Sequence, residues 1–360
     1  MVKPFIIQTP AGPRKIGSHE PCFIVAEMSA NHKQDYNRAV EIVRGAAAAG
    51  ADAIKLQTYV PDSMTIDCNK QWFYVGGKDN PEAWKGQTFY ELYQKAYTPR
   101  EWHADLKKLA EGLGLVFFSA PFSIADVDFL ETLDTPLYKI ASYEATDIPL
   151  LKKVASTGKP VILSVGFATL EEIEFSVKTL RDAGVKDLAL LHCVTSYAHT
   201  PEPEFTNLRT MHDLQNKFQT GVGFSDNNGG IEIPILAAAM GASIIEKHFL
   251  IESDEAFDSQ FSLGSDDFKA MVETIRRNEI IMGTIHYGCQ TPAEEYNRGF
   301  RRSLFVVKDI KQGEQFTVEN VRSIRPACGL ETKFYDAVLG KQATQDIERG
   351  TPLSWNLIKH

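Results

Sequence analysis

The sequence predicts an α/β fold, a (β/α)8 TIM barrel followed by a small, mostly β C-terminal domain. Short apolar segments alternate strictly with helical patterns, which is typical of a parallel sheet. Eight such units occupy the first part of the 360-residue chain, which favours a closed barrel over an open doubly wound sheet. After residue 300 the pattern changes to short strands and turns without a long helix, which indicates a second domain.

Each expected strand is a short apolar run that ends in polar side chains, a pattern typical of buried parallel strands that carry residues into a site. Thr98, followed by Pro99 and Glu101, has the pattern of a capping box at a helix start. Thr169 begins another helix and Gly158 ends one. The expected strands cover residues 23–27, 52–57, 115–119, 137–142, 160–164, 187–193, 220–226 and 242–249, and the expected helices cover residues 35–50, 98–114, 124–133, 148–157, 169–180, 208–218, 233–240 and 266–282.

Two segments do not fit the alternation. Residues 1–20 are expected to form an irregular lead-in. Residues 58–97 contain Gly-Gly, Asn-Pro and clustered aromatic residues, and they are too long for a plain connection, so we expect a lid or an edge of the site. The expected domain boundaries are 1–283 for the barrel, 284–300 for a polar linker and 301–360 for the second domain.

The composition excludes several classes of protein. A net charge of -9 argues against nucleic acid or an anionic membrane as the main partner. The five cysteines are widely spaced and form no Cys-x-x-Cys pair, which indicates a reducing compartment without a disulfide framework or a zinc knot. No stretch has the pattern of a signal peptide or a membrane span, and no phosphate-binding glycine motif follows a strand. We therefore expect a cytoplasmic protein.

Polar residues at the ends of the barrel strands should converge, because these carboxyl ends meet at one mouth. Glu246 and His248 sit two apart in the last strand, so they share the face that would be the lumen, while Lys247 points away. Any one such residue is more often a solvated charge or a filler than a functional group, and only their joint placement favours a site. The strand-end residues are Glu27, Lys55, Gln57, Ser119, Lys139, Ser142, Glu144, Ser164, Thr195, Ser225, Asp226, Glu246 and His248.

The chemistry of these side chains indicates an anionic ligand. Lys55 and Lys139 supply positive charge and the serines supply hydroxyl donors, which suits a phosphate or a carboxylate. The strand-end glutamates, with His248, suit a metal ion or acid–base catalysis. A barrel lysine can also form a Schiff base with a carbonyl substrate, as an aldolase does, so two enzyme classes remain open. Borohydride trapping with substrate would separate them.

Five stretches of the sequence carry a resemblance to a known family: FIVAEMSANH, GADAIKLQTYVPD, YKIASYE, SIIEKHF and the tail FRRSLFVVKDI…IRPACGL…GKQATQDIERGTPL. They are similar to the sialic acid (nonulosonic acid) synthases, (β/α)8 enzymes that carry a C-terminal antifreeze-like domain. The resemblance covers nearly the whole chain. Two further stretches, WKGQTFYELYQKAYTPREWH and DSQFSLGSDDFKAMV, look most like the pseudaminic acid synthase branch.

This resemblance implies a transferase that condenses phosphoenolpyruvate with the open aldehyde form of a 2,4-diacetamido-2,4,6-trideoxy hexose (6-deoxy-AltdiNAc) and water. The products would be a nine-carbon nonulosonic acid and phosphate, with C–O cleavage of phosphoenolpyruvate. It also implies a divalent metal (Mn, Mg or Co) and a homodimer with exchanged C-terminal domains. The alternatives are an N-acetylneuraminate or legionaminate synthase, or a catalytically weakened relative that acts as a binding protein.

The resemblance also implies a role for each matching residue. Glu27 would handle the attacking water and Glu246 would sit beside the metal, which His248 would ligate. Arg325 of the small domain would reach the sugar in the site of a neighbouring subunit. Lys55, Lys139, Ser142, Ser164 and Ser225 would hold phosphoenolpyruvate, while Gln57, Glu144, Tyr197 and Asp258 would face the sugar.

The chain departs from the family pattern at three positions. Asn227 stands where the family's Ser-Asp-His motif has its second metal ligand, and an amide oxygen is a weaker donor to manganese or cobalt than an imidazole. Ala120 replaces a Thr that could bind phosphate, and Thr195 replaces a sugar-facing Asn of the neuraminate branch. We expect weaker metal binding and a different sugar, while the anion pocket remains.

Overall fold

The computed structural model describes residues 2–76, 84–195, 203–251 and 256–359. The chain divides into two compact units, Met1–Gly283 and Thr284–His360. In the first unit the described strands β3 to β10 form a closed parallel barrel in the order β10-β3-β4-β5-β6-β7-β8-β9, which confirms the predicted fold class. The barrel strands are β3 Phe23–Glu27, β4 Ala53–Thr58, β5 Val116–Pro121, β6 Tyr138–Ile140, β7 Val161–Ser164, β8 Leu188–Val194, β9 Gly221–Asp226 and β10 Ile244–His248.

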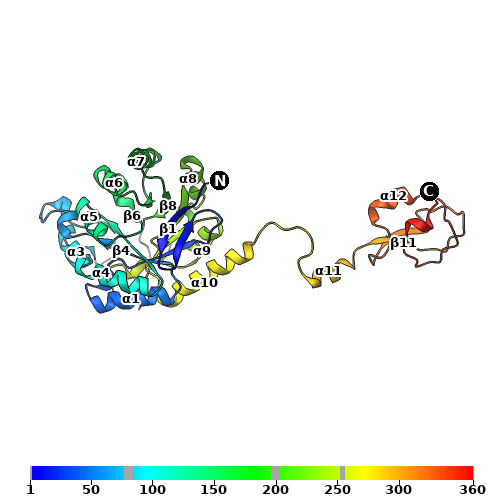
Figure 1. Cartoon of the computed structure of the whole chain (residues 1–360), viewed down its shortest axis with the longest axis horizontal. Helices are drawn as coiled ribbons and strands as arrows, with labels where there is room; N and C mark the ends of the chain where they lie inside the picture. The colour runs from blue at the N-terminus through cyan, green and yellow to red at the C-terminus, as the bar shows by residue number, and fades with distance from the viewer. Residues whose placement is uncertain (1, 77–83, 196–202, 252–255, 360) are drawn as a thin grey trace. The chain divides into compact units, whose positions relative to one another are not determined.

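Helices cover the outside of this barrel (Figure 1). The helix expected to begin at Thr169 does so as α7, and a capping box is found there. The capping box expected at Thr98 is wrong: a 3-10 turn precedes α4, and the Thr98 hydroxyl instead bonds His32 Nε2 at 3.0 Å. Among the described residues, no helix has both the length and the apolar character of a membrane span. The outer helices are α1 Tyr36–Ala48, α4 His103–Gly112, α5 Ile124–Thr132, α6 Ile148–Ala155, α7 Leu170–Asp182, α8 Thr210–Phe218, α9 Glu232–Ala239 and α10 Ser265–Met282.

The N-terminal segment is a β-hairpin, so the prediction of an irregular lead-in is wrong. Strands β1 (Phe5–Thr9) and β2 (Gly12–Ile16) pair antiparallel around a turn that uses the left-handed backbone of Gly12, with φ +108°. The buried apolar residues of the hairpin, Phe5, Ile7 and Ile16, form one apolar cluster with side chains of the barrel strands. Burial alternates along FIIQT, but the residue types do not, because the exposed Ile6 is apolar.

The barrel lumen is layered from apolar to polar. Along β3, Phe23 and Val25 belong to the apolar lumen cluster, and Glu27, the next residue on that face, lines a cavity. Strand β10 repeats the order, since Ile244 belongs to the cluster while Glu246 and His248 line the cavity. The apolar side chains and the hairpin therefore fill one end of the lumen, and the polar side chains line the cavity at the other end, where the strands have their carboxyl ends.

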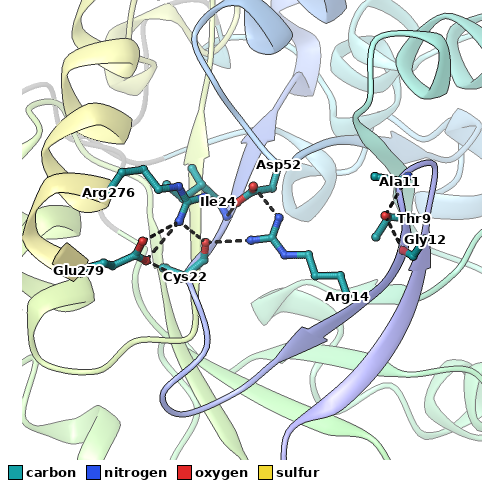
Figure 2. A network of polar contacts seen from close by, with 9 residues as sticks. All are labelled: Thr9, Ala11, Gly12, Arg14, Cys22, Ile24, Asp52, Arg276 and Glu279. Carbon is teal, nitrogen blue, oxygen red and sulfur yellow. Dashed lines mark hydrogen bonds and ion pairs between the residues drawn. The ribbon is translucent and has the colours of Figure 1, made fainter. Parts of the chain in front are cut away.

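A polar network connects the N-terminal hairpin, strand β3 and helix α10 (Figure 2). The Asp52 carboxylate accepts hydrogen bonds from Arg14 of β2 at 2.5 Å, from Arg276 of α10 at 2.5 Å and from the Ile24 backbone N–H at 2.7 Å. Both arginines also donate to the Cys22 carbonyl oxygen. The network holds the hairpin, β3 and α10 in place where β10 pairs with β3 and closes the barrel.

The long segment after β4 contains helices α2 (Pro61–Met64) and α3 (Phe89–Ala96) and a short 3-10 turn, Gln71–Phe73. Helix α3 begins at a capping box formed by Thr88 and Glu91. Side chains of this segment line the cavity at the barrel mouth, which confirms the expectation of an edge of the site.

The second unit has its own apolar core and is built mostly from short extended segments. Strands β11 (Ser303–Val306) and β12 (Val321–Ile324) pair antiparallel, and α12 covers Tyr335–Val338. The segment 284–300, expected to be a plain polar linker, contains the short helix α11 (Pro292–Arg298), which begins at the capping box of Thr291.

Candidate active site

The carboxyl ends of the barrel strands surround a cavity of about 530 Å³. Strand register brings its polar residues together, because Glu27 of β3 pairs with Lys55 of β4 on one side and with His248 of β10 on the other. Ser225 of β9 pairs with Glu246 of β10 in the same way. The cavity is lined by twelve of the residues expected in the site, namely Glu27, Lys55, Gln57, Lys139, Ser142, Glu144, Ser164, Ser225, Asn227, Glu246, His248 and Asp258, and also by Thr195.

The other expected residues lie elsewhere. Tyr197 is outside the described residues. Arg325 is an exposed residue of the second unit. Ser119 and Asp226 are buried strand-end residues that do not line the cavity. The Ser119 hydroxyl lies 2.6 Å from that of Thr58, and Asp226 forms a fully buried ion pair of 2.8 Å with Lys247.

The two lysines of the cavity are already paired with carboxylates. Lys55 Nζ lies 2.5 Å from Glu27 Oε2 and 3.7 Å from Glu246 Oε2. Lys139 Nζ lies 3.1 Å from Glu246 Oε1, which also accepts a 3.0 Å hydrogen bond from the Ser225 hydroxyl. All four charged side chains are buried. The lysines and glutamates expected at the strand ends therefore form one network of opposite charges.

These pairs determine the protonation of the cavity. Burial would raise the pKa of Glu246, but Lys139 and Lys55 outweigh it and lower that pKa to about 2. Burial raises the pKa of Glu27, against the opposing effect of Lys55. Burial also lowers the pKa of Lys139, although Glu246 opposes that shift. Glu246 therefore stays ionised, whereas Glu27 binds a proton more readily than Glu246 does.

Three polar atoms in the cavity wall are buried and have neither a hydrogen-bond nor an ion-pair partner among the described residues. They are Ser164 Oγ, Glu144 Oε2 and His248 Nδ1. Buried polar groups are normally paired, so an unpaired group in a cavity indicates a place where a ligand binds. Burial raises the pKa of Glu144 to about 7 and lowers that of His248 to about 3. His248 is therefore a neutral imidazole, the form that ligates metals.

His248 and Asn227 are the candidate metal ligands. The β9–β10 pairing ends at Lys247 and Asp226, and the next residues are His248, the last of β10, and Asn227, which directly follows β9. The Asn227 amide nitrogen donates to Cys193 Sγ at 3.0 Å, which leaves the amide oxygen as the atom with ligand chemistry. Within the described residues no group of three or more His, Cys, Asp or Glu could hold a metal. An unpaired buried imidazole beside an amide oxygen fits a divalent cation whose remaining ligands come from substrate or water.

One side of the cavity is apolar. Aromatic rings contact one another there, with centroids 5.6 Å apart for Tyr59 and Tyr93 and 5.3 Å apart for Tyr59 and Phe122. Phe261 packs edge-on against His248 at 4.8 Å. The sequence showed that residues 58–97 are rich in aromatic residues, but not that they face the lysines and glutamates across the same space.

Ser29 is a lining residue that the sequence analysis missed. It follows Glu27 at the end of β3, and its hydroxyl contacts both Gln57 and Asp258. His103 of α4 is also buried, and its Nε2 lies 2.8 Å from the Thr58 hydroxyl.

A closed parallel barrel with a cavity at the carboxyl ends of its strands, lined by buried lysines, carboxylates and serines, defines a (β/α)8 enzyme. The chain belongs to the NeuB family, whose model matches residues 42–287. A SAF domain model matches residues 301–359, the second unit.

Three relatives represent three branches of this family. The pseudaminic acid synthase of Campylobacter jejuni is 43% identical over 92% of this chain and 95% of its own length. The N,N'-diacetyllegionaminic acid synthase of Legionella pneumophila is 33% identical over 95% of this chain and 96% of its own. The crystal structure of the N-acetylneuraminic acid synthetase of Leptospira borgpetersenii, in complex with citrate, is 30% identical and covers 82% of this chain and 96% of that one, with a TM-score of 0.70.

Proposed function

We propose that this protein is a pseudaminic acid synthase, which condenses phosphoenolpyruvate with 6-deoxy-AltdiNAc and water to give a nonulosonic acid and phosphate. The observation that carries the proposal is the set of three unpaired polar atoms in one cavity. Each belongs to a different part of the expected site: Ser164 to the phosphoenolpyruvate side, Glu144 to the sugar side and His248 to the metal. The 43% identity to a pseudaminic acid synthase supports this branch over the others.

The polar side of the cavity would bind phosphoenolpyruvate. Its phosphate and carboxylate would share the ammonium groups of Lys55 and Lys139 with Glu27 and Glu246. Ser142, Ser164 and Ser225 would donate hydroxyl hydrogen bonds to the same anion. Because Glu246 is a permanent carboxylate, binding of a further anion calls for extra positive charge, which a divalent cation provides.

The apolar side of the cavity would receive the sugar. A 2,4-diacetamido-2,4,6-trideoxy hexose carries two acetyl methyl groups and a C6 methyl group, and these suit a wall of aromatic rings. Gln57, Glu144 and Asp258 would bind its polar groups, as would Tyr197 and, from a neighbouring subunit, Arg325. A sugar with more hydroxyl groups would leave them unpaired against this wall.

In the reaction, C3 of phosphoenolpyruvate forms a bond to the aldehyde carbon, and the aldehyde oxygen takes up a proton. Water adds to C2 and loses a proton, which Glu27 would accept because its pKa is raised. The bond between C2 and the phosphate oxygen then breaks, the C2 hydroxyl gives its proton to the leaving inorganic phosphate, and C2 becomes a keto carbon. Glu246 would hold both lysines in place during these steps.

His248 and the Asn227 amide oxygen would hold a divalent cation, Mn, Mg or Co. A bound cation would supply Lewis-acid stabilisation of the negative charge on the aldehyde oxygen. Since Asn227 is a weak ligand, we expect binding to tighten when substrate is present. We further propose a domain-swapped homodimer that works in the cytoplasm, in keeping with five free thiols.

The deciding experiment measures phosphate release from phosphoenolpyruvate with a panel of sugars, with and without a divalent metal. The panel contains 6-deoxy-AltdiNAc, the legionaminate precursor and N-acetylmannosamine. Preference for 6-deoxy-AltdiNAc supports the proposal, whereas preference for either other sugar assigns the chain to another branch. No turnover with any of them would mark a binding protein, and an imine trapped on Lys139 by borohydride would mark an aldolase.

A further inference from the structure

We infer that Ser29 is a positioning residue that holds Asp258 and Gln57 in place for the sugar, an inference that rests on the proposed function. Ser29 begins the 3-10 turn Ser29–His32 that follows β3. It is buried, lines the cavity and lies two residues after Glu27.

The backbone of Ser29 adopts a conformation that side chains other than glycine rarely adopt. Its φ is +47°, in the left-handed region. Such residues cluster at active sites and persist only where the surroundings fix them. Here the conformation turns the backbone N–H of Ser29 toward Glu27 Oε1, at 3.1 Å, while the side chain points into the polar network.

The hydrogen bonds of Ser29 have defined directions. Its hydroxyl donates to Asp258 Oδ2 and accepts a 3.1 Å hydrogen bond from Gln57 Nε2. The same amide nitrogen of Gln57 also donates to Glu27 Oε1, at 3.1 Å. The amide of Gln57 thus uses both of its N–H groups, and Ser29 connects it to a carboxylate that lies on a distant loop.

Asp258 depends on this hydroxyl. Among the described residues its other donor is the Ala30 backbone N–H, at 3.3 Å. Without Ser29 Oγ, this longer hydrogen bond is the one that the described part of the chain leaves to the buried carboxylate, and we expect the carboxylate to turn away or to bind a proton. The loop itself would remain attached, because Asn31 Nδ2 bonds both Ser262 Oγ and the Phe249 carbonyl, each at 2.9 Å. The hydroxyl therefore positions one side chain rather than the whole loop.

The test uses two variants of the full-length protein. Ser29→Gly removes the hydroxyl and relieves the left-handed backbone, so it is expected to fold. The matched control is Ser243→Ala, which removes another buried serine hydroxyl. Ser243 directly precedes β10, and within the described part of the chain its hydroxyl bonds the Val222 carbonyl of β9 alone. We expect Ser29→Gly to raise the KM for the sugar by about tenfold to a hundredfold and to leave the KM for phosphoenolpyruvate within about twofold. Ser243→Ala should change neither KM.

An unchanged KM for the sugar, or equal rises in both KM values, would overturn the inference. A crystal structure of Ser29→Gly gives a readout that needs no activity, with Asp258 and Gln57 expected to leave their present positions. If the unaltered protein turns over no sugar, the proposed function fails on its own, and this structure decides the positioning role. Unmoved Asp258 and Gln57 side chains would exclude that role.

Discussion

At the scale of single residues, the carboxyl group of Glu144 gives a direct link between pH and stability. Burial raises its pKa from an ordinary 4.5 to about 7. In this interval the folded chain holds a proton that the unfolded chain has lost, so the free energy of unfolding falls as pH rises. Above pH 7 the folded protein therefore carries the full cost of a buried charge at Glu144.

We predict that Glu144→Gln is more stable than the unaltered protein at pH 8, by on the order of 1–3 kcal/mol, with little difference near pH 4.5. Chemical denaturation at the two pH values measures this. Glu41→Gln, at an exposed position of α1, is the control and should show no such pH dependence. Equal stability of Glu144→Gln and the unaltered protein at pH 8 would contradict the prediction.

Asn227 gives a second prediction at this scale. Replacing it with histidine would place a second imidazole next to His248, on the neighbouring strand. We predict that Asn227→His binds Mn²⁺ about tenfold more tightly or better, because imidazole is the stronger ligand for this ion. Titration calorimetry measures the affinity, and His248→Ala should abolish binding in both backgrounds. If Asn227→His binds Mn²⁺ no better than the unaltered protein, this pair is not the metal site.

At the scale of elements, the polar network around Asp52 fastens helix α10 to strand β3 (Figure 2). The Asp52 side chain is 15% exposed and pairs with Arg14 and Arg276, which are 26% and 30% exposed. Removing its charge takes away the carboxylate that the two partly buried guanidinium groups share, and leaves them the Cys22 carbonyl and, for Arg276, Glu279.

We predict that Asp52→Asn destabilises the protein by about 2–4 kcal/mol. Neither KM should change, because Asp52 precedes β4 while the cavity lies at the strand's other end. Thermal denaturation and kinetics on the same sample measure both. Asp134→Asn, which removes a 94% exposed carboxylate paired with Lys159, should have little effect on stability. A loss of activity in folded Asp52→Asn would disagree with a purely structural role.

At the scale of the whole molecule, the proposed dimer gives Arg325 a role in the site of the partner subunit. It is exposed, and among the described residues it forms no ion pair. If the proposed dimer exchanges C-terminal domains, each site combines Glu27 of one subunit with Arg325 of the other.

We predict that Glu27→Gln and Arg325→Ala, each inactive or nearly so alone, restore activity when the two chains are coexpressed. Half of the dimers would be mixed, and one of the two sites in each mixed dimer would be intact, so about a quarter of full activity should return. Phosphate release by the purified mixture measures this. The absence of any recovery would show that Arg325 does not act in the partner's site.

The sequence by itself determined the alternation of strands and helices and the polar residues at the strand ends. These features depend on local periodicity, which each short segment carries in its own residues. The same periodicity separates Ser225, on the lumen face, from Asp226, which pairs with Lys247 behind it. In the same way Thr169 began its helix as expected, because a capping box needs only four neighbouring residues.

Only the tertiary structure decided which of these groups meet. Barrel closure and strand register set Glu27 between Lys55 and His248 and turned the lysines toward carboxylates. Thr98, a cap by its sequence, instead bonds His32, which is far away along the chain. Contacts between distant segments depend on how the whole barrel packs, and no local pattern encodes them. The residues of the chain thus specified which chemical groups the site contains, and the closure of the barrel specified which of these groups pair with one another.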